Sequence, residues 1–219
     1  MLDYSKEKLV ELGAEITTRE IYQQPDVWQT AFNHYKAAFL KGIEEKHDYI
    51  KVIFTGAGTS AYVGDTLLPY FRKLYNERQW NFNSVATTDI VANPEVHLHK
   101  EIPTVLVARS GNSPESVATV DLAKQLVDEL YQVTITCAAE GKLAQQAHGD
   151  ERNLLLLQPA PSNDAGFAMT SSFTSMMLTA LLVFDPADLA QKEARVAELI
   201  ALSQKVLANV ADVQALTEL

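Results

Sequence analysis

Small hydroxyl and amide side chains gather where one run of β-forming residues passes into a helix-like pattern. Ser110, Asn112, Ser113 and Ser116 stand within seven positions at this junction. Serine and asparagine are ordinary residues of turns and helix N-caps, so a capped helix start accounts for them. The same groups, together with the N–H groups of a helix start, also bind phosphate. The junction therefore leaves two interpretations open, a helix cap or an anion site.

Two further strand-to-helix junctions carry residues of the same kind. The stretch TGAGTSA, residues 55–61, sets two glycines before Thr59 and Ser60. Glycine allows a tight turn and a close backbone approach, and the hydroxyls can cap the next helix or donate to a ligand. The stretch SNDAGFAMTSS, residues 162–172, precedes an apolar helix. Two dense hydroxyl-bearing loops in one sheet strengthen the phosphate interpretation until it stands level with that of unrelated helix caps.

A dinucleotide site is the competing interpretation of residues 56–61. GAGTSA fits the pattern G-x-G-x-x-A, with Asp89 as the acid that would hold a ribose. This pattern is short and leaves the polar loop at Ser110 unexplained, because a dinucleotide pyrophosphate is held at the first loop. No lysine follows the glycines, so the sequence has no Walker A loop.

Other catalytic patterns are weaker. Of the five histidines only His97 and His99 lie close together, in a segment predicted to be an exposed loop or strand, and we expect no metal and no cofactor. There is no G-x-S-x-G motif. Glu20 and Glu115 are acids near predicted helix starts, where an interaction with the helix dipole is the default role.

Composition limits the partners. The 219 residues carry a formal net charge of −10, which disfavours nucleic acid and anionic membranes. No apolar run is long enough to cross a membrane, and the acidic amphipathic N-terminus does not resemble a signal peptide. The single cysteine, Cys137, is expected to be buried, which fits a cytoplasmic protein. A bound anion should therefore be held by backbone N–H groups, hydroxyls and helix N-termini.

The elements that position these loops alternate along the chain. Strands are expected at 49–56, 82–90, 104–110, 131–139 and 152–160. Helices are expected between and after them, at 60–75, 114–130, 141–148 and 168–184. Strands that are apolar throughout and alternate with helices predict an α/β fold, with a parallel sheet covered on both faces.

Helical segments flank this unit. Before it, Leu9, Leu12 and Ile16 recur at helical spacing, and a second helix is expected to have Pro25 in its first turn. After it, an amphipathic helix is predicted from about Asp188 onward. That last helix could pack on the domain, join a second protomer or lead into a second domain.

Four motifs in order resemble the sugar isomerase (SIS) domain family. They are TREIYQQPDVW, FTGAGTSAYVGD, VARSGNSPESVATV and AMTSSFTSM. Together with ATTDIVANP they look closest to the tagatose-6-phosphate ketose/aldose isomerases, a group also described as galactosamine-6-phosphate deaminase/isomerases. The resemblance covers nearly the whole chain.

The resemblance implies a flavodoxin-like three-layer αβα sandwich with a five-stranded parallel sheet. It divides the chain into an N-terminal helical extension at 1–46, a SIS domain at 47–186 and a C-terminal linker helix at 187–219. Members of this type carry two SIS domains in tandem, so the chain resembles an N-terminal half. A homo-oligomer is expected, because the family completes its sites across subunits.

The resemblance also implies the roles of the polar loops. The phosphate-binding residues would be Ser110, Asn112, Ser113 and Ser116. Thr59 and Ser60 would touch the sugar or the phosphate, and the backbone from Phe167 to Thr170 would border the sugar. Ala108 and Arg109 stand where the related glucosamine-6-phosphate synthase has serine and glutamine. The catalytic base, the ring-opening histidine and the tail lysine of that synthase match no motif here, so no catalytic residue is assigned.

Two functions follow as hypotheses. In the first, the chain belongs to an enzyme that converts galactosamine 6-phosphate or an aldose phosphate to a ketose phosphate such as tagatose 6-phosphate. In the second, it is a non-catalytic phosphosugar-binding SIS module, either a sensor or a truncated half. A DNA-binding regulator would need a basic recognition helix, which the N-terminal helices lack.

Overall fold

The fold is built on five parallel strands. The computed structural model describes residues 4–33, 38–109 and 111–209. Its strands are β1 (Ile50–Thr55), β2 (Trp80–Ser84), β3 (Thr104–Arg109), β4 (Leu130–Thr136) and β5 (Asn153–Leu157). They form one sheet in the order β2-β1-β3-β4-β5, with every neighbouring pair parallel. The predicted five-stranded parallel sheet is confirmed.

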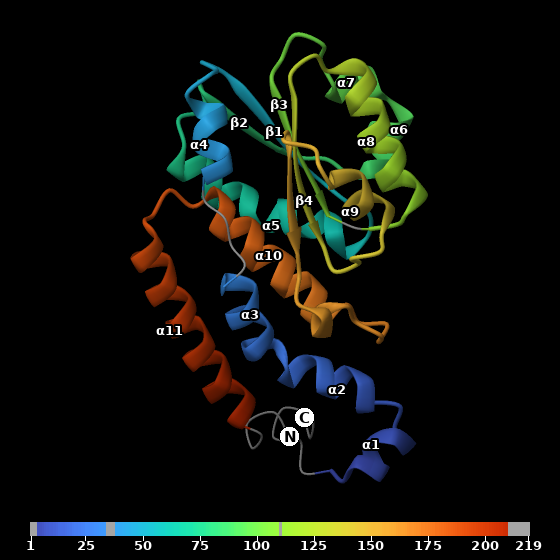
Figure 1. The fold of residues 1–219 in the computed structure, drawn as a ribbon. Coiled ribbons are helices and arrows are strands. Elements are labelled where there is room, and N and C mark those ends of the chain that lie inside the picture. The colour runs from blue at the N-terminus through green and yellow to red at the C-terminus, as the bar shows by residue number, and fades with distance from the viewer. Residues whose placement is uncertain (1–3, 34–37, 110, 210–219) are drawn as a thin grey trace.

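Helices cover both faces of this sheet (Figure 1). One face carries α4 (Ala38–Glu44), α5 (Thr59–Leu74) and α10 (Thr170–Phe184). The other carries α6 (Thr87–Ala92), α8 (Pro114–Leu126) and α9 (Lys142–Ala147), with α7 (Pro94–His97) beside α6. A short 3-10 turn, η1 (Ala160–Ser162), lies between β5 and α10. The helices and the sheet form the predicted αβα sandwich.

The strands are apolar throughout because each has two buried faces. In β1, Val52 and Phe54 pack on the α5 and α10 side, while Ile53 packs on the side of α6 and α8. Phe54 makes an edge-on contact with Phe184 of α10, with ring centroids 5.2 Å apart. Such aromatic contacts add to the stabilisation from apolar burial and fix α10 against the sheet.

The N- and C-terminal helices form an outer layer on α10. Before the sheet come α1 (Lys6–Glu11), α2 (Glu15–Tyr22) and α3 (Gln24–Asn33), and after α10 comes α11 (Leu189–Ala208). Val196 of α11 is buried with Leu178 and Leu182 of α10, and with Trp28 of α3 beside them. Of the three possible positions for the last predicted helix, the described part of α11 packs on the domain. No helix in the described ranges has the length and apolarity needed to cross a membrane.

Three predicted elements differ from the structure. The strand expected at 82–90 stops at Ser84, because β1 ends at Thr55 and offers no further ladder. There the chain turns as the N–H of Thr87 donates to Gly56 O at 3.1 Å, and α6 begins. The helix expected at 114–130 ends at Leu126, since Leu130 already belongs to β4. The first helical pattern splits in two at Gly13, whose φ is +66°.

Candidate functional site

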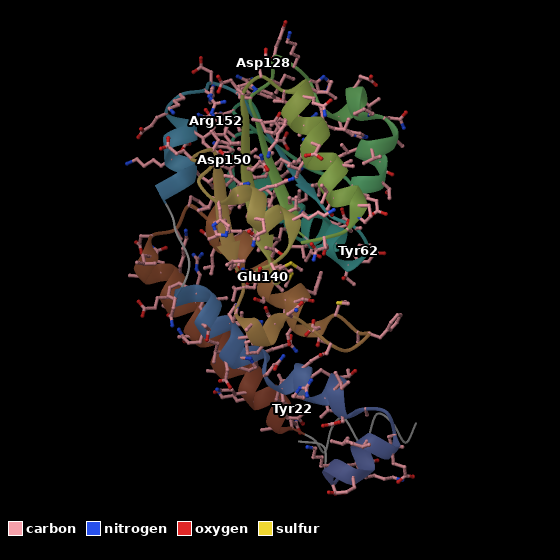
Figure 2. All side chains as sticks on the ribbon, turned by 45° about the vertical axis from the view of Figure 1, so that its right-hand side comes forward. Tyr22, Tyr62, Asp128, Glu140, Asp150 and Arg152 are labelled. Atoms are coloured by element: carbon pink, nitrogen blue, oxygen red, sulfur yellow. The ribbon has the colours of Figure 1, made fainter. Side chains whose placement is uncertain are left out.

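The strand order places a topological switch point at the carboxyl edge of the sheet, between β1 and β3. The chain runs from β1 through α5 to β2 on one side, whereas β3 lies on the other side of β1 and continues into α8. The loops after β1 and β3 therefore leave adjacent strand ends toward opposite faces, which is where open parallel sheets bind ligands. Figure 2 gives the orientation: Tyr62 and Glu140 follow strand ends, while Asp128, Asp150 and Arg152 precede strands at the opposite edge.

The loop after β1 presents the start of a long helix. Gly58 has φ +58° and ψ −133°, a conformation that side-chain-bearing residues rarely adopt. It turns the chain so that α5 begins at Thr59, which is exposed, and Ser60, which is half-buried. The first turn of α5 contains no acidic residue. The N–H groups of Ser60 and Ala61 donate to the carbonyls of Ala57 and Gly58, so this helix start would attract an anion mainly through its dipole.

The loop after β3 presents a second helix start, that of α8. Ser113 is the N-cap: its hydroxyl accepts the N–H of Ser116 at 3.2 Å and donates to the Ser116 hydroxyl at 2.8 Å. Asn112 is exposed, and its side-chain oxygen accepts the N–H of Lys142 at 3.0 Å. The cap interpretation of Ser113 is confirmed. Ser110 lies outside the described residues, and the phosphate role of the other three residues stays a prediction.

The third junction, between β5 and α10, uses its serines internally. Ser171 Oγ donates to the carbonyl of Glu20, and Ser172 Oγ donates to Asp164, both at 2.7 Å. Phe167 is fully exposed. Thr170 begins α10, and its hydroxyl is buried without a hydrogen-bond partner. The junction thus presents Phe167 outward while its serines hold the loop to α2 and to itself.

Three buried hydroxyls mark the carboxyl edge of the sheet. The Oγ1 atoms of Thr55, Thr87 and Thr170 have no hydrogen-bond partner in the part of the chain that the structure describes. These residues stand at the end of β1, the start of α6 and the start of α10. Buried hydroxyls are normally paired, so their concentration at this edge fits a region that binds water or ligand. Thr55 and Thr87 were not predicted as site residues, although both lie in the motifs quoted above.

Glu20 was assigned wrongly from the sequence. It does not stand at a helix start but in the last turn of α2, and only 2 % of the residue is exposed. Its Oε1 accepts the N–H of Ala165 at 2.7 Å and that of Gly166 at 2.9 Å. Its carboxylate therefore binds the loop before α10 instead of a helix N-terminus. The signal that could have found it was the TREIYQQPDVW motif.

The residues of the alternative sites do not come together. Asp89 is exposed on α6, beyond the end of β2, where a ribose-binding acid would be expected at the strand end itself. His97 ends α7, and the exposed His99 ring contacts the carbonyl of Val96 at 3.2 Å. His97 thus belongs to a short helix instead of the expected loop or strand, whereas His99 lies in an exposed loop as predicted. Among the residues that the structure describes, no three His, Cys, Asp or Glu side chains are grouped closely enough to hold a metal ion.

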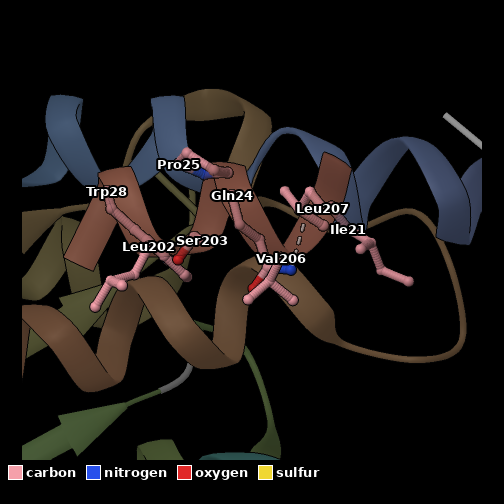
Figure 3. Close-up of a pocket in the computed structure, with 8 residues that line it drawn as sticks. All are labelled: Ile21, Gln24, Pro25, Trp28, Leu202, Ser203, Val206 and Leu207. Atoms are coloured by element: carbon pink, nitrogen blue, oxygen red, sulfur yellow. Dashed lines mark hydrogen bonds between the residues drawn. The ribbon is translucent and has the colours of Figure 1, made fainter. Parts of the chain in front are cut away.

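A pocket of about 250 Å³ lies away from the strand ends, between α2–α3 and α11 (Figure 3). Its lining is mostly apolar and consists of Ile21, Gln24, Pro25, Trp28, Leu202, Ser203, Val206 and Leu207. The side-chain amide of Gln24 donates to the Ile21 carbonyl at 3.1 Å. None of these lining residues is charged, so the pocket is less suited to bind a sugar phosphate than the helix starts at the strand ends.

The parallel sheet, with helices on both faces and the starts of α5 and α8 at adjacent strand ends, defines the class as an α/β sandwich protein. Within that class the chain belongs to the SIS domain family, whose model matches residues 47–185. It is 44 % identical over 189 residues to D-galactosamine-6-phosphate deaminase AgaS of Shewanella sp. strain ANA-3. This match covers 83 % of the chain and 49 % of the relative.

Solved structures agree with this placement. A Clostridium novyi NT protein assigned to the tagatose-6-phosphate ketose/aldose isomerases matches with a TM-score of 0.86 and 37 % identity, covering 97 % of this chain and 55 % of that one. The tagatose-6-phosphate ketose/aldose isomerase of Escherichia coli matches with a TM-score of 0.71 and 36 % identity, covering 86 % and 52 %. The chain therefore spans about half the length of the relatives it matches.

Proposed function

We propose that this chain is the sugar-phosphate-binding SIS half of an amino-sugar-phosphate isomerase/deaminase. Its substrate would be galactosamine 6-phosphate or an aldose phosphate, and its product a ketose phosphate such as tagatose 6-phosphate. The observation that carries the proposal is the pair of helix starts, α5 and α8, at adjacent strand ends of the switch point. The identity to galactosamine-6-phosphate deaminases supports the choice of substrate class.

The phosphate is proposed to lie at the start of α8, with Asn112, Ser113 and Ser116 around it and Ser110 completing the loop. Thr59 and Ser60 at the start of α5 would contact the sugar or the phosphate. The N-termini of both helices supply positive ends of dipoles, which a chain of net charge −10 needs in place of a basic patch. The backbone from Phe167 to Thr170 would border the sugar.

The proposed reaction begins with opening of the sugar ring. A base then removes the C2 proton of the open-chain aldehyde while O1 is protonated, which gives an enolamine. A proton is next delivered to C1 as the nitrogen loses one, which leaves a hydroxymethyl group at C1 and an imine at C2. Water hydrolyses that imine, giving tagatose 6-phosphate and ammonia. The residues assigned above bind and orient the substrate, a contribution that works through proximity and fixed dipoles. No base is assigned among them.

The experiment is to incubate the protein with galactosamine 6-phosphate and to measure ammonia and tagatose 6-phosphate, with direct binding measured by calorimetry in parallel. Equal amounts of the two products are expected if the enzyme proposal is right. Binding without turnover would favour the alternative, a non-catalytic phosphosugar-binding module. Absence of binding at millimolar sugar phosphate would overturn both.

We also propose a homo-oligomeric, cytoplasmic protein in which the extension at 1–46, the SIS domain at 47–186 and the helix at 187–219 are distinct parts. Exposed apolar side chains on α11 support self-association, namely Leu199, Leu202 and Val206. Light scattering on the purified protein tests this, and a monomeric mass at micromolar concentration would contradict it.

A further inference from the structure

Glu20 connects two distant parts of the chain. It lies on α2, and its Oε1 accepts two successive N–H groups, those of Ala165 and Gly166, from the loop before α10. Hydrogen bonds to a carboxylate are stronger than those between neutral groups. In the same contact the Glu20 carbonyl accepts the hydroxyl of Ser171. One residue of the N-terminal extension therefore holds the loop from both its beginning and its end.

A second carboxylate holds the far side of the same loop. Asp164 accepts the N–H of Ser171 at 3.2 Å and that of Ser172 at 2.8 Å, which caps the start of α10. The segment 167–169 thus stands between two fixed points. Phe167 projects from it and is fully exposed. No described part of the domain covers this aromatic ring, although its loop is anchored on either side.

Close packing makes the Glu20 contact exacting. A Cβ atom added to Gly166 would lie 2.7 Å from Glu20 Oε2 and 3.2 Å from Ile16 Cγ2. Glu20 Oε2 is itself buried, and no described part of the chain gives it a hydrogen-bond partner. A buried carboxylate oxygen is costly to leave unpaired, so stability alone does not account for the choice of glutamate at this place.

We propose that Glu20 is a positioning residue of the sugar site. Its carboxylate fixes the backbone of residues 165 and 166, and so sets where the segment 167–170 lies along the sugar. The inference rests on the proposed function, since it requires that this segment borders the substrate. It also gives the TREIYQQPDVW motif a role: the N-terminal extension forms the support of one wall of the site.

The test separates the sugar from the phosphate. Glu20→Ala is expected to weaken binding of galactosamine 6-phosphate by about tenfold or more, whereas binding of inorganic phosphate, held at the start of α8, stays unchanged. Glu20→Gln retains an oxygen that can accept the two N–H groups and is expected to lose much less affinity. Gly166→Ala disturbs the same contact from the loop side and should reproduce the effect of Glu20→Ala.

Asp185→Ala is the matched control, because Asp185 is another buried carboxylate, at the opposite end of α10. It should lower the unfolding temperature without changing sugar-phosphate binding. Equal affinity of Glu20→Ala and the unaltered protein for galactosamine 6-phosphate would overturn the inference alone. Parallel losses of sugar phosphate and inorganic phosphate would also overturn it. Failure of the unaltered protein to bind galactosamine 6-phosphate would instead overturn the proposed function.

Discussion

The hydroxyl of Ser113 donates to the hydroxyl of Ser116 across 2.8 Å, and it also accepts the Ser116 N–H at 3.2 Å. A hydroxyl has one proton to donate, so Ser113 uses its own within this pair. The Ser116 hydroxyl is left with a proton directed away from Ser113. Ser113 thus fixes the geometry of the helix start, and under the proposed function Ser116, which is 3 % exposed, would supply its remaining donor to the phosphate.

Ser116→Ala is expected to weaken sugar-phosphate binding by ~1–3 kcal/mol, the range for unmaking a hydrogen bond to a charged group. Ser113→Ala should cause a similar loss and also lower the stability of the protein by ~1 kcal/mol through loss of the cap. Calorimetric titration and thermal unfolding measure the two effects. Ser5→Ala is the control, because Ser5 caps α1 in the same way. Affinity unchanged in both Ser113→Ala and Ser116→Ala would contradict the phosphate assignment.

Gly58→Ala is expected to destabilise the protein by ~1–3 kcal/mol and to weaken ligand binding, because a Cβ disfavours the backbone conformation that starts α5. No neighbouring atom lies within 4 Å of the added Cβ, so the cost is conformational rather than steric. Urea unfolding and calorimetry measure both quantities. Gly42 lies at an exposed position of α4, and a Cβ added there likewise meets no atom within 4 Å. Gly42→Ala should therefore raise stability by ~0.5–1 kcal/mol. A Gly58→Ala variant with the stability and the ligand affinity of the unaltered protein would refute this explanation.

Asp185 should contribute more to stability than its ion pair does. Its side chain is 7 % exposed and accepts Arg195 at 2.9 Å, while that arginine side chain is 57 % exposed. Asp185 also accepts the N–H of Ala187 and the hydroxyl of Tyr70. Asp185→Ala is expected to cost ~1–3 kcal/mol and Arg195→Ala less than ~1 kcal/mol. A double-mutant cycle from urea unfolding checks this, and equal costs for the two variants would count against it.

Cys137 is expected to react slowly with iodoacetamide in the folded protein. Burial raises the pKa of its thiol, Asp164 raises it further, and the hydrogen bond from Ser162 at 3.3 Å opposes them. Since the thiolate is the reactive form, alkylation at pH 8 should be much slower than in urea and should accelerate as the pH rises. Mass spectrometry of the modified protein follows both rates. The same rate with and without urea would show that the thiol is accessible.

The fold could be predicted further than the site. Apolar strands that alternate with helices predict a parallel sheet with two covered faces. The structure contains this sheet. The prediction of a strand at 82–90 was wrong beyond Ser84. The residues there favour a strand locally, but β1, the neighbouring strand, ends at Thr55 and leaves them no partner. Strand length depends on the neighbour, which local preference does not contain.

The polar loops show the same division. Ser113 as a helix cap follows from local sequence, because the cap and its helix are consecutive. The role of Glu20 depends on Ala165 and Gly166, which no local pattern connects to it. Whether the hydroxyls of Thr55 and Thr87 find a partner depends on how the surrounding strands and helices pack. Such long-range contacts cannot be predicted from the residues that are adjacent in the sequence.

The contact between Glu20 and Ala165 also sets an order of events during synthesis. The two residues are separated by 145 positions, so α2 leaves the ribosome long before the loop that it holds. At ~5–20 residues per second, this delay lasts roughly ten to thirty seconds. Through that interval α2 and α3 have neither their loop nor α10, and the apolar side chains destined for α10 stay uncovered. The N-terminal helices can therefore reach their native contacts only after the last strand and α10 have emerged.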